Sequence, residues 1–170
     1  QAENGYELWL RYEKITDVGL RQQYKNTFKG LIVTGHSATL DIAARELSSG
    51  IGKMLNLDAT AKLTPLFLHK TKLIKGGVRL KTPPPPPHSL IIGTTQSPLI
   101  DSNLTSAEKQ QLGEQGYIIK SIQLNGQYPM TIIGANTDIG VLYGSFRLLR
   151  LMANHQSITH LHIIDAPKLK

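Results

Sequence analysis

The fold is decided by the segment YIIKSIQLNGQYPMTIIGANTDIGVLYGSFRLLRLMAN, residues 117–154. Its first half contains two runs rich in β-branched residues, at 117–124 and 130–134, which predict strands. The dipeptide Asn125-Gly126 between them is typical of a tight hairpin turn. The two strands should therefore pair in the antiparallel sense.

The second half of this segment predicts a long helix over roughly residues 139–154, with Thr137 or Asp138 as its N-cap. Apolar residues extend nearly all the way round this helix, so much of it should be buried. Gly140 and Gly144 are four residues apart and share one face. That face can lie very close to a sheet because glycine carries no β-carbon.

Similar patterns extend outward along the chain. A run at 31–34 bounded by glycines predicts a buried strand, and Ser37 then caps a helix whose apolar spacing continues to Leu55. The polyproline run Pro83–Pro87 must be extended, either as an exposed stiff connector or as a ligand for a proline-recognition module. The other expected elements are a helix capped by Asp17, strands at 66–68, 89–93 and 161–164, and a short helix from Thr105 or Ser106 to Leu112.

The order of these elements, β-α-β-(α)-β-β-α-β, predicts one α+β domain with a mixed sheet and helices packed against it. This is a two-layer arrangement with α/β-like features. A chain of 170 residues is long enough for one such domain with its own core. No apolar run approaches the length of a helix that spans a bilayer, so no membrane span is expected.

Composition excludes several classes of chemistry. The chain has no cysteine, which excludes disulfides, thiolate metal sites and cysteine catalysis. The net charge of +7 would suit an anionic partner, but the basic residues are scattered and no groove-reading motif accompanies them, so we expect no nucleic-acid partner. The chain begins with Gln1 instead of Met, which suits a mature terminus left after leader removal or a trimmed chain. The compartment stays open, with the periplasm or the cell exterior favoured over the cytoplasm.

Three motifs only partly match known catalytic or binding motifs. His160 and His162 are spaced to share one face of a strand, but two imidazoles need a third metal ligand, so we expect surface or interdomain histidines. The glycines of Gly134–Gly144 have neither P-loop nor dinucleotide-binding spacing and are better explained by close helix packing. Gly35-His36-Ser37 follows a strand as a nucleophile elbow does, but Thr39 stands where the motif G-x-S-x-G has its second glycine. Ser37 is therefore better explained as a helix cap. The sequence therefore assigns no catalytic, cofactor-binding or metal-binding residue.

The aromatic residues near the N-terminus give one candidate for ligand contact. Trp9, with Tyr6 and Tyr12, could stack on the apolar face of a sugar, and the alternative is a core or interdomain anchor. Trp9 is therefore the one candidate substrate-binding residue. The candidate carboxylates, for which the sequence gives no paired geometry, are Glu7, Glu13 and Glu46.

Four segments together resemble the N-terminal accessory domain of family 67 α-glucuronidases. Residues 134–152 resemble the second helix of that domain. The opening GYELWLRY (5–12), the strand LIIGT (90–94) with the following SPLI (97–100), and LGEQGYIIKSI (112–122) agree with it as well, in the family's order. The last helix is also similar to the accessory domain of β-hexosaminidases. The opening GYELWLRY favours α-glucuronidase.

The resemblance implies a β-hexosaminidase-like accessory domain over residues 1–165, with 166–170 leading into a catalytic (β/α)8 barrel. The parent enzyme would remove 4-O-methyl-glucuronic acid from the ends of xylan fragments by inverting hydrolysis. Its acid and base would lie on the barrel, so no catalytic residue is carried over to this chain. The implied partners are the domain's own C-terminal barrel and, through the parent enzyme, oligosaccharides derived from glucuronoxylan, and no cofactor is expected. The alternatives are an accessory domain of a different glycosidase, such as a β-hexosaminidase, and a free-standing carbohydrate-binding module.

Overall fold

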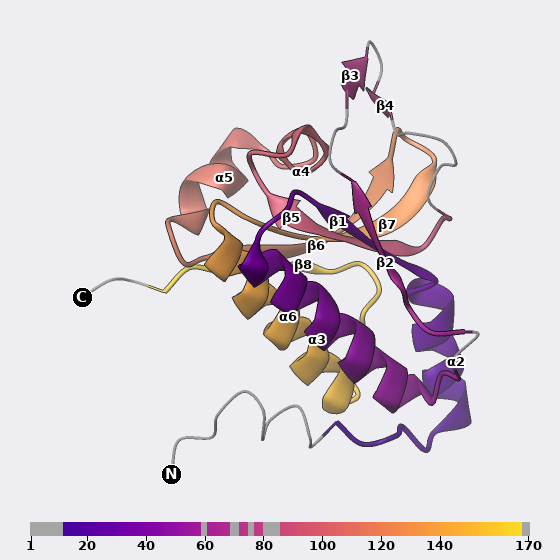
Figure 1. Cartoon of the computed structure of the whole chain (residues 1–170). Coiled ribbons are helices and arrows are strands. Elements are labelled where there is room, and N and C mark those ends of the chain that lie inside the picture. The colour runs from indigo at the N-terminus through magenta and orange to yellow at the C-terminus, as the bar shows by residue number, and fades with distance from the viewer. Residues whose placement is uncertain (1–11, 59–60, 69–71, 75–76, 80–85, 168–170) are drawn as a thin grey trace.

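A computed structural model describes residues 12–58, 61–68, 72–74, 77–79 and 86–167 of the chain. Its centre is a six-stranded sheet with helices packed against it (Figure 1). The strand order is β2-β1-β5-β7-β6-β8. The strands are β1 (Gly30–Thr34), β2 (Pro65–Leu68), β5 (Ser89–Thr94), β6 (Tyr117–Leu124), β7 (Tyr128–Ala135) and β8 (His162–Asp165).

The sheet is mixed because it contains both parallel and antiparallel pairs. β1 pairs in parallel with β2 and β5, and β5 pairs in parallel with β7. β6 is antiparallel to both of its neighbours, β7 and β8. The β6–β7 hairpin turns at Asn125 and Gly126, whose φ angles of 52° and 76° are the consecutive positive values that a tight hairpin turn favours. The predicted hairpin is therefore confirmed.

One face of the sheet is covered by α3 (Ala38–Leu55) and α6 (Asp138–Ala153), which lie side by side (Figure 1). α2 (Val18–Thr27) packs against α3. Buried strand residues such as Leu31, Leu90 and Ile133 share one apolar core with these helices. α3 and α6 approach closely at Gly50, where a β-carbon would stand 2.8 Å from Leu149 Cδ2.

α6 also lies very close to the strands, and glycine makes this approach possible. A β-carbon at Gly140 would stand 2.4 Å from the carbonyl oxygen of Gly116, and one at Gly144 would stand 2.6 Å from Ile133 Cγ2. Both separations are shorter than ordinary atomic contacts in a packed interior. The prediction that Gly140 and Gly144 mark a close helix–sheet contact is confirmed.

The opposite face of the sheet carries two short helices, α4 (Pro98–Asp101) and α5 (Ser106–Leu112). They form a second, smaller core with Ile91, Ile118 and Ile132. These strand residues point away from the first core because successive side chains of a strand alternate between faces. A separate hairpin of β3 (Lys72–Ile74) and β4 (Gly77–Arg79) projects from the sheet (Figure 1).

The predicted α+β class, with helices packed on a mixed sheet, is confirmed. Asp17 and Ser37 cap α2 and α3 as predicted, by accepting hydrogen bonds from backbone amides three residues further along the chain. The β3–β4 hairpin and α4 were not predicted, because elements of three or four residues are too short to show a hydrophobic period. Of the polyproline run, Pro86 and Pro87 are exposed as expected, and residues 83–85 lie outside the described residues.

Candidate functional site

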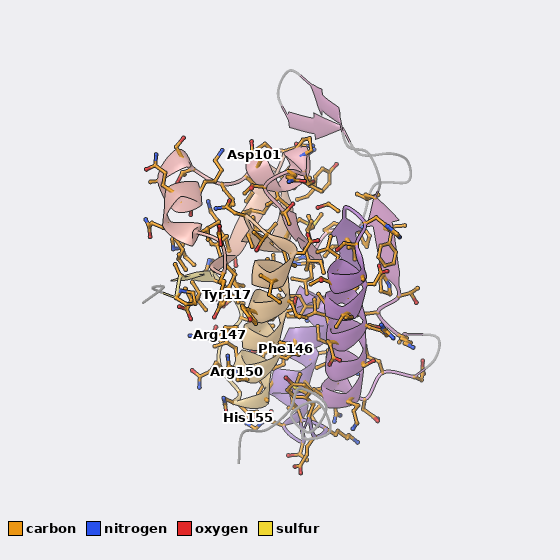
Figure 2. The ribbon with its side chains drawn as sticks, turned by 60° about the vertical axis from the view of Figure 1, so that its left-hand side comes forward. Asp101, Tyr117, Phe146, Arg147, Arg150 and His155 are labelled. Atoms are coloured by element: carbon orange, nitrogen blue, oxygen red, sulfur yellow. The ribbon has the colours of Figure 1, made fainter. Side chains whose placement is uncertain are left out.

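The solvent side of the long-helix layer exposes apolar residues. On α6, Ile139 and Tyr143 lie one turn apart and are 37% and 41% exposed. On the neighbouring helix α3, Ile42 is 41% exposed. Arg147 and Arg150 project from the flank of α6 that faces away from α3 (Figure 2). The spacing of Ile139, Tyr143, Arg147 and Arg150 places them along one side of α6, and we call this stripe the outer helix face.

Two buried polar atoms accompany this layer. The Tyr12 side chain is 3% exposed, and neither its hydroxyl nor Glu46 Oε2 has a hydrogen-bond partner in the described part of the chain. Burial, and then the charge of Glu46, raises the pKa of Tyr12 to about 12, while Arg150 opposes this shift. Burial also raises the pKa of Glu46, with Arg45 opposing it. A buried polar atom left without a partner costs about 1–3 kcal/mol.

A charged cluster centred on Glu108 lies on the opposite side of the sheet. Glu108 Oε1 accepts from the Thr105 backbone amide at 2.8 Å and from Lys120 Nζ at 2.9 Å, and Oε2 lies 2.7 Å from His162 Nε2. Burial by itself would raise the pKa of Glu108, but the bonds from Thr105, Lys120 and His162 outweigh burial and lower it to about 2. The carboxylate is therefore ionised at neutral pH and is not suited to be a general acid.

The cluster gives Glu108 a structural task. Thr105 and Glu108 form a capping box at the start of α5, and Lys120 and His162 lie on β6 and β8. One carboxylate thus ties a short helix to two strands. Glu108 was not predicted from the sequence, although its spacing from Thr105 is the known signal for a capping box. Lys120 and His162 are distant from Glu108 in sequence, so no local pattern indicated them as its partners.

A second polar cluster joins α6 to the end of β8. The Tyr117 hydroxyl donates to Asp165 Oδ2 at 3.2 Å, and Arg147 Nη1 lies 3.4 Å from that hydroxyl and 3.9 Å from Asp165 Oδ2 (Figure 2 labels Tyr117 and Arg147). Burial, and then the charge of Asp165, raises the pKa of Tyr117, which keeps the hydroxyl protonated as a donor. Because Asp165 is the last residue of β8, the cluster holds the point where the chain leaves the sheet.

The two histidines considered as a starting metal site do not share a strand face. β8 begins at His162, one residue later than predicted, and His160 has a φ of 54°, which is outside the extended region. Residues two apart share a face only within an extended strand, so that prediction is wrong. Across the ranges that the structure describes, no three His, Cys, Asp or Glu side chains gather as a metal site would require.

The remaining sequence motifs occupy structural positions. Ser37 Oγ accepts from the Leu40 amide at 3.1 Å, which is the helix-cap role predicted for it. Thr137, the first of the two predicted caps of α6, accepts from the Gly140 amide. These hydroxyl groups satisfy the free amides at helix starts.

The aromatic and acidic candidates near the N-terminus are only partly described. The buried ring of Tyr12 has no free face for stacking on a sugar. Glu13 is exposed, whereas Glu46 lies beside Tyr12. Three candidates, Tyr6, Glu7 and Trp9, lie outside the described residues. The prediction for Trp9 therefore stays a prediction.

Comparison with known protein families gives a match over most of the chain. The sequence model of a family described as Glycosyl hydrolase family 67 N-terminus matches residues 8–148, which is well over half of the chain. The matched range runs from before α2 into α6 and includes both Glu108 and Tyr143. No curated protein matches the chain. Among the described residues, no helix combines the length and apolar character that a bilayer crossing requires.

Proposed function

The chain belongs to the family of glycosyl hydrolase family 67 N-terminal domains, and we propose that it is the non-catalytic accessory domain of a xylan-degrading α-glucuronidase. Membership in this family makes the chain part of a glycosidase. The proposed reaction of the whole enzyme is hydrolysis of terminal 4-O-methyl-glucuronic acid from xylo-oligosaccharides. The observation that carries the proposal is the family match over residues 8–148.

The carboxylates with shifted pKa values support a non-catalytic role. Glycoside hydrolysis requires a carboxylic acid with a raised pKa and a second carboxylate within about 10 Å, on the far side of the scissile bond. Glu108 has a lowered pKa and is engaged by three partners. Burial raises the pKa of Glu46 and Arg45 opposes that shift, and Glu46 Oε2 has no hydrogen-bond partner among the described residues. Glu108 is therefore unsuited to be the acid of this reaction.

The outer helix face supports a contact with a catalytic barrel. Ile139 and Tyr143 present apolar surface on α6, and Arg147 and Arg150 place charged groups on the same stripe (Figure 2). Protein interfaces commonly combine an apolar centre with polar groups that are satisfied by the partner. We therefore assign the outer helix face as the surface that docks on the barrel.

The end of the sheet supports the proposed domain boundary. β8 ends at Asp165, where Tyr117 and Arg147 hold the last carboxylate. Residues 1–165 would form the accessory domain, and residues 166–170 would begin the connection to a (β/α)8 barrel. A fixed exit point would restrict the orientation of the domain that follows.

The proposed function is tested by comparing the chain alone with the complete parent enzyme. Both are incubated with xylo-oligosaccharides that carry a terminal 4-O-methyl-glucuronosyl group, and released uronic acid is measured. We expect release by the parent enzyme and none by the chain alone. Release by the chain alone would show that the domain is catalytic. A parent enzyme that cleaves N-acetylhexosaminides instead would assign the domain to another glycosidase.

The docking surface has its own test in the parent enzyme. Tyr143→Asp places a charge on the outer helix face, and Val18→Asp places one on α2, where Val18 is 67% exposed outside that face. We expect Tyr143→Asp to lower the unfolding temperature of the parent enzyme and Val18→Asp to leave it unchanged, because a charge buried in an interface is costly. Equal effects of the two variants would exclude the outer helix face as the docking surface.

A further inference from the structure

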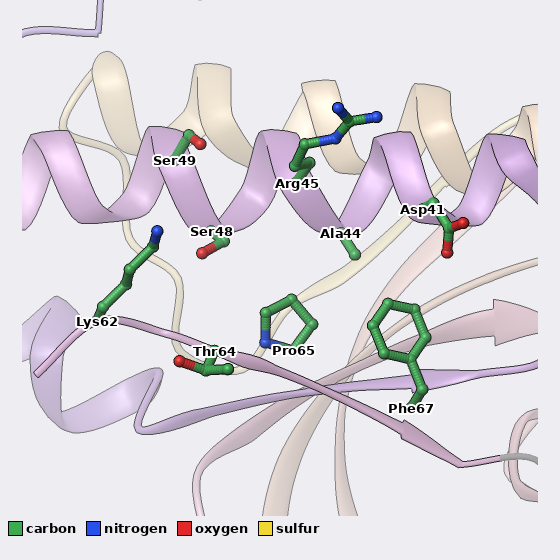
Figure 3. Close-up of a pocket in the computed structure, with 9 residues that line it drawn as sticks. All are labelled: Asp41, Ala44, Arg45, Ser48, Ser49, Lys62, Thr64, Pro65 and Phe67. Atoms are coloured by element: carbon green, nitrogen blue, oxygen red, sulfur yellow. The ribbon is translucent and has the colours of Figure 1, made fainter. Parts of the chain in front are cut away.

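A groove outside the outer helix face has the chemistry of a ligand site. It lies between α3 and the edge strand β2, and its volume is about 450 Å³ (Figure 3). Small-molecule pockets of proteins are commonly about 300–1,000 Å³, so one or two sugar rings would fit in a groove of this size. The groove exists because β2 is the last strand of the sheet and α3 extends above it.

The wall of the groove is fixed by one buried hydrogen bond. Ser48 Oγ, on α3, donates to the carbonyl oxygen of Leu63 at 2.6 Å, and Ser48 is 4% exposed. This bond ties the segment that leads into β2 to the helix. The positions of Lys62 and Thr64, on either side of Leu63, are therefore set by the helix, which gives the groove a defined shape.

Several polar groups of the groove remain available to a ligand. Figure 3 shows the Lys62 side chain directed toward α3, near Ser48 and Ser49. Lys62 and Thr64 are exposed, and in the described part of the chain no hydrogen bond or ion pair engages the side chains of Lys62, Ser49 or Thr64. One end of the groove is thus lined by a cation and two hydroxyl groups that have no partner among the described residues.

The two ends of the groove differ in charge. Lys62 lies at one end, and Asp41 and Phe67 lie at the other (Figure 3). Arg45 lies on the rim between them, with its guanidinium group directed away from β2 (Figure 3). Pro65 adds apolar surface between the two ends, and the Phe67 ring adds it beside Asp41 (Figure 3). A ligand that fits both ends carries a negative charge at one end and hydroxyl donors beside an apolar ring face at the other.

We propose that this groove binds the carboxylate-bearing sugar of an acidic oligosaccharide. The uronate carboxylate would accept from Lys62 and Ser49, and Asp41 would accept from sugar hydroxyls at the far end. The apolar face of the pyranose would pack on Phe67. A nucleic acid or other polyanion fits poorly because Asp41 would repel its next charge. A neutral sugar would leave Lys62 without its anion.

This inference rests on the proposed function for the source of the ligand, because glucuronosyl-bearing oligosaccharides are the proposed substrate of the parent enzyme. The groove would then be a second binding site for these oligosaccharides, separate from the active site on the catalytic barrel. The two proposals can fail separately. Binding to the groove is measured on the chain alone, whereas the proposed function is measured by hydrolysis with the parent enzyme.

The test is a titration of the ¹⁵N-labelled chain with sodium glucuronate, followed by amide chemical shifts. Methyl glucoside serves as the neutral sugar and sodium acetate as the carboxylate without a ring. We expect saturable shifts at residues 41–49 and 62–67 with a Kd of about 1 mM, and weaker binding of both reference compounds. Shifts confined to other residues, or equal binding of methyl glucoside, would overturn the proposal.

Matched charge variants make the test specific to the groove. Lys62→Gln should weaken glucuronate binding about five- to tenfold while leaving methyl glucoside binding unchanged, because only the charge-assisted bond is removed. Arg150→Gln, which removes one positive charge from α6 outside the groove, should leave glucuronate binding unchanged. Equal losses in the two variants would indicate non-specific attraction by net charge and would overturn the proposal.

Discussion

The two faces of the sheet hold their helices by different means. On one face, α3 and α6 share a large apolar core, and α6 approaches the strands where Gly140 and Gly144 carry no β-carbon. On the other face, the short helix α5 is fixed by its capping box and by Glu108, which bonds to Lys120 and His162. The first attachment depends on close packing, and the second adds hydrogen bonds and ion pairs to a smaller apolar core.

The difference follows from helix length. α3 and α6 have 18 and 16 residues, which lets each bury an extended apolar stripe. α5 has 7 residues and is too short to be stable by itself, so hydrogen bonds and ion pairs at its start contribute a larger share of its stability. We therefore expect added volume to affect the long-helix face most and acid to affect the α5 face most.

The largest effect is expected from added volume at Gly140. In Gly140→Ala the new methyl group would stand 2.4 Å from the carbonyl oxygen of Gly116, a backbone atom that cannot turn aside. We expect the free energy of unfolding to fall by about 3 kcal/mol, measured by urea denaturation at neutral pH.

Gly52→Ala is the matched control for that variant. Gly52 also lies in a long helix, but nothing lies within 4 Å of a β-carbon placed there. This variant should gain about 0.5–1 kcal/mol, because alanine favours the helix more than glycine does. A loss in Gly52→Ala, or no loss in Gly140→Ala, would contradict the idea that close approach is what requires glycine.

The next effect is expected from Glu108→Gln on the opposite face. The variant keeps the size of the side chain but leaves Lys120 without its anion, and we expect a loss of about 2 kcal/mol at pH 7. The measurement is urea denaturation of the variant beside the unmodified chain. An unchanged stability would show that the cluster does not hold α5 on the sheet.

The same variant predicts a pH dependence. The pKa of Glu108 is lowered from 4.5 to about 2, so its stabilising contribution is complete above about pH 4.5 and is lost as the pH falls toward 2. The difference in stability between the unmodified chain and Glu108→Gln should therefore shrink over this range. The difference in free energy of unfolding between the unmodified chain and Gly140→Ala should instead stay constant over this pH range. If this difference changed with pH in the same way for both variants, the two faces would not differ in how they hold their helices.

A smaller effect is expected from Thr105→Ala. It removes the hydroxyl that accepts from the Glu108 amide at 3.1 Å, but Glu108 keeps its bonds to Lys120 and His162. We expect a loss of about 1 kcal/mol, as for other N-cap substitutions. Amide hydrogen exchange should show the increased opening within α5, and increased opening spread evenly over α6 would contradict a local role.

The smallest effect is expected from Tyr143→Asp in the chain alone. Tyr143 is 41% exposed on the outer helix face, so the variant should stay within about 0.5 kcal/mol of the unmodified chain in thermal or urea unfolding. A large loss would show that Tyr143 supports the fold of this domain, and the loss expected in the parent enzyme would then not indicate docking.

Much of the fold could be predicted because its signals are local. Asn125-Gly126 specifies the hairpin through its backbone preferences, and the caps Ser37 and Asp17 mark helix starts through bonds that span three residues. The prediction for His160 failed because its positive φ is set by the connection into β8, which no local pattern indicated. The groove between α3 and β2 was also missed, since it depends on which strand forms the edge of the sheet.

The sequence by itself determined the hairpin, the helix caps, the glycine-bearing helix and the family to which the chain belongs, because each depends on neighbouring residues or on the order of segments. Only the tertiary structure decided the strand order, the ties of Glu108 to Lys120 and His162, and the exposure of Tyr143. These features join residues far apart in the chain. The free energy of such contacts depends on the distance between the groups and on their burial in the folded chain. A local sequence pattern contains neither quantity.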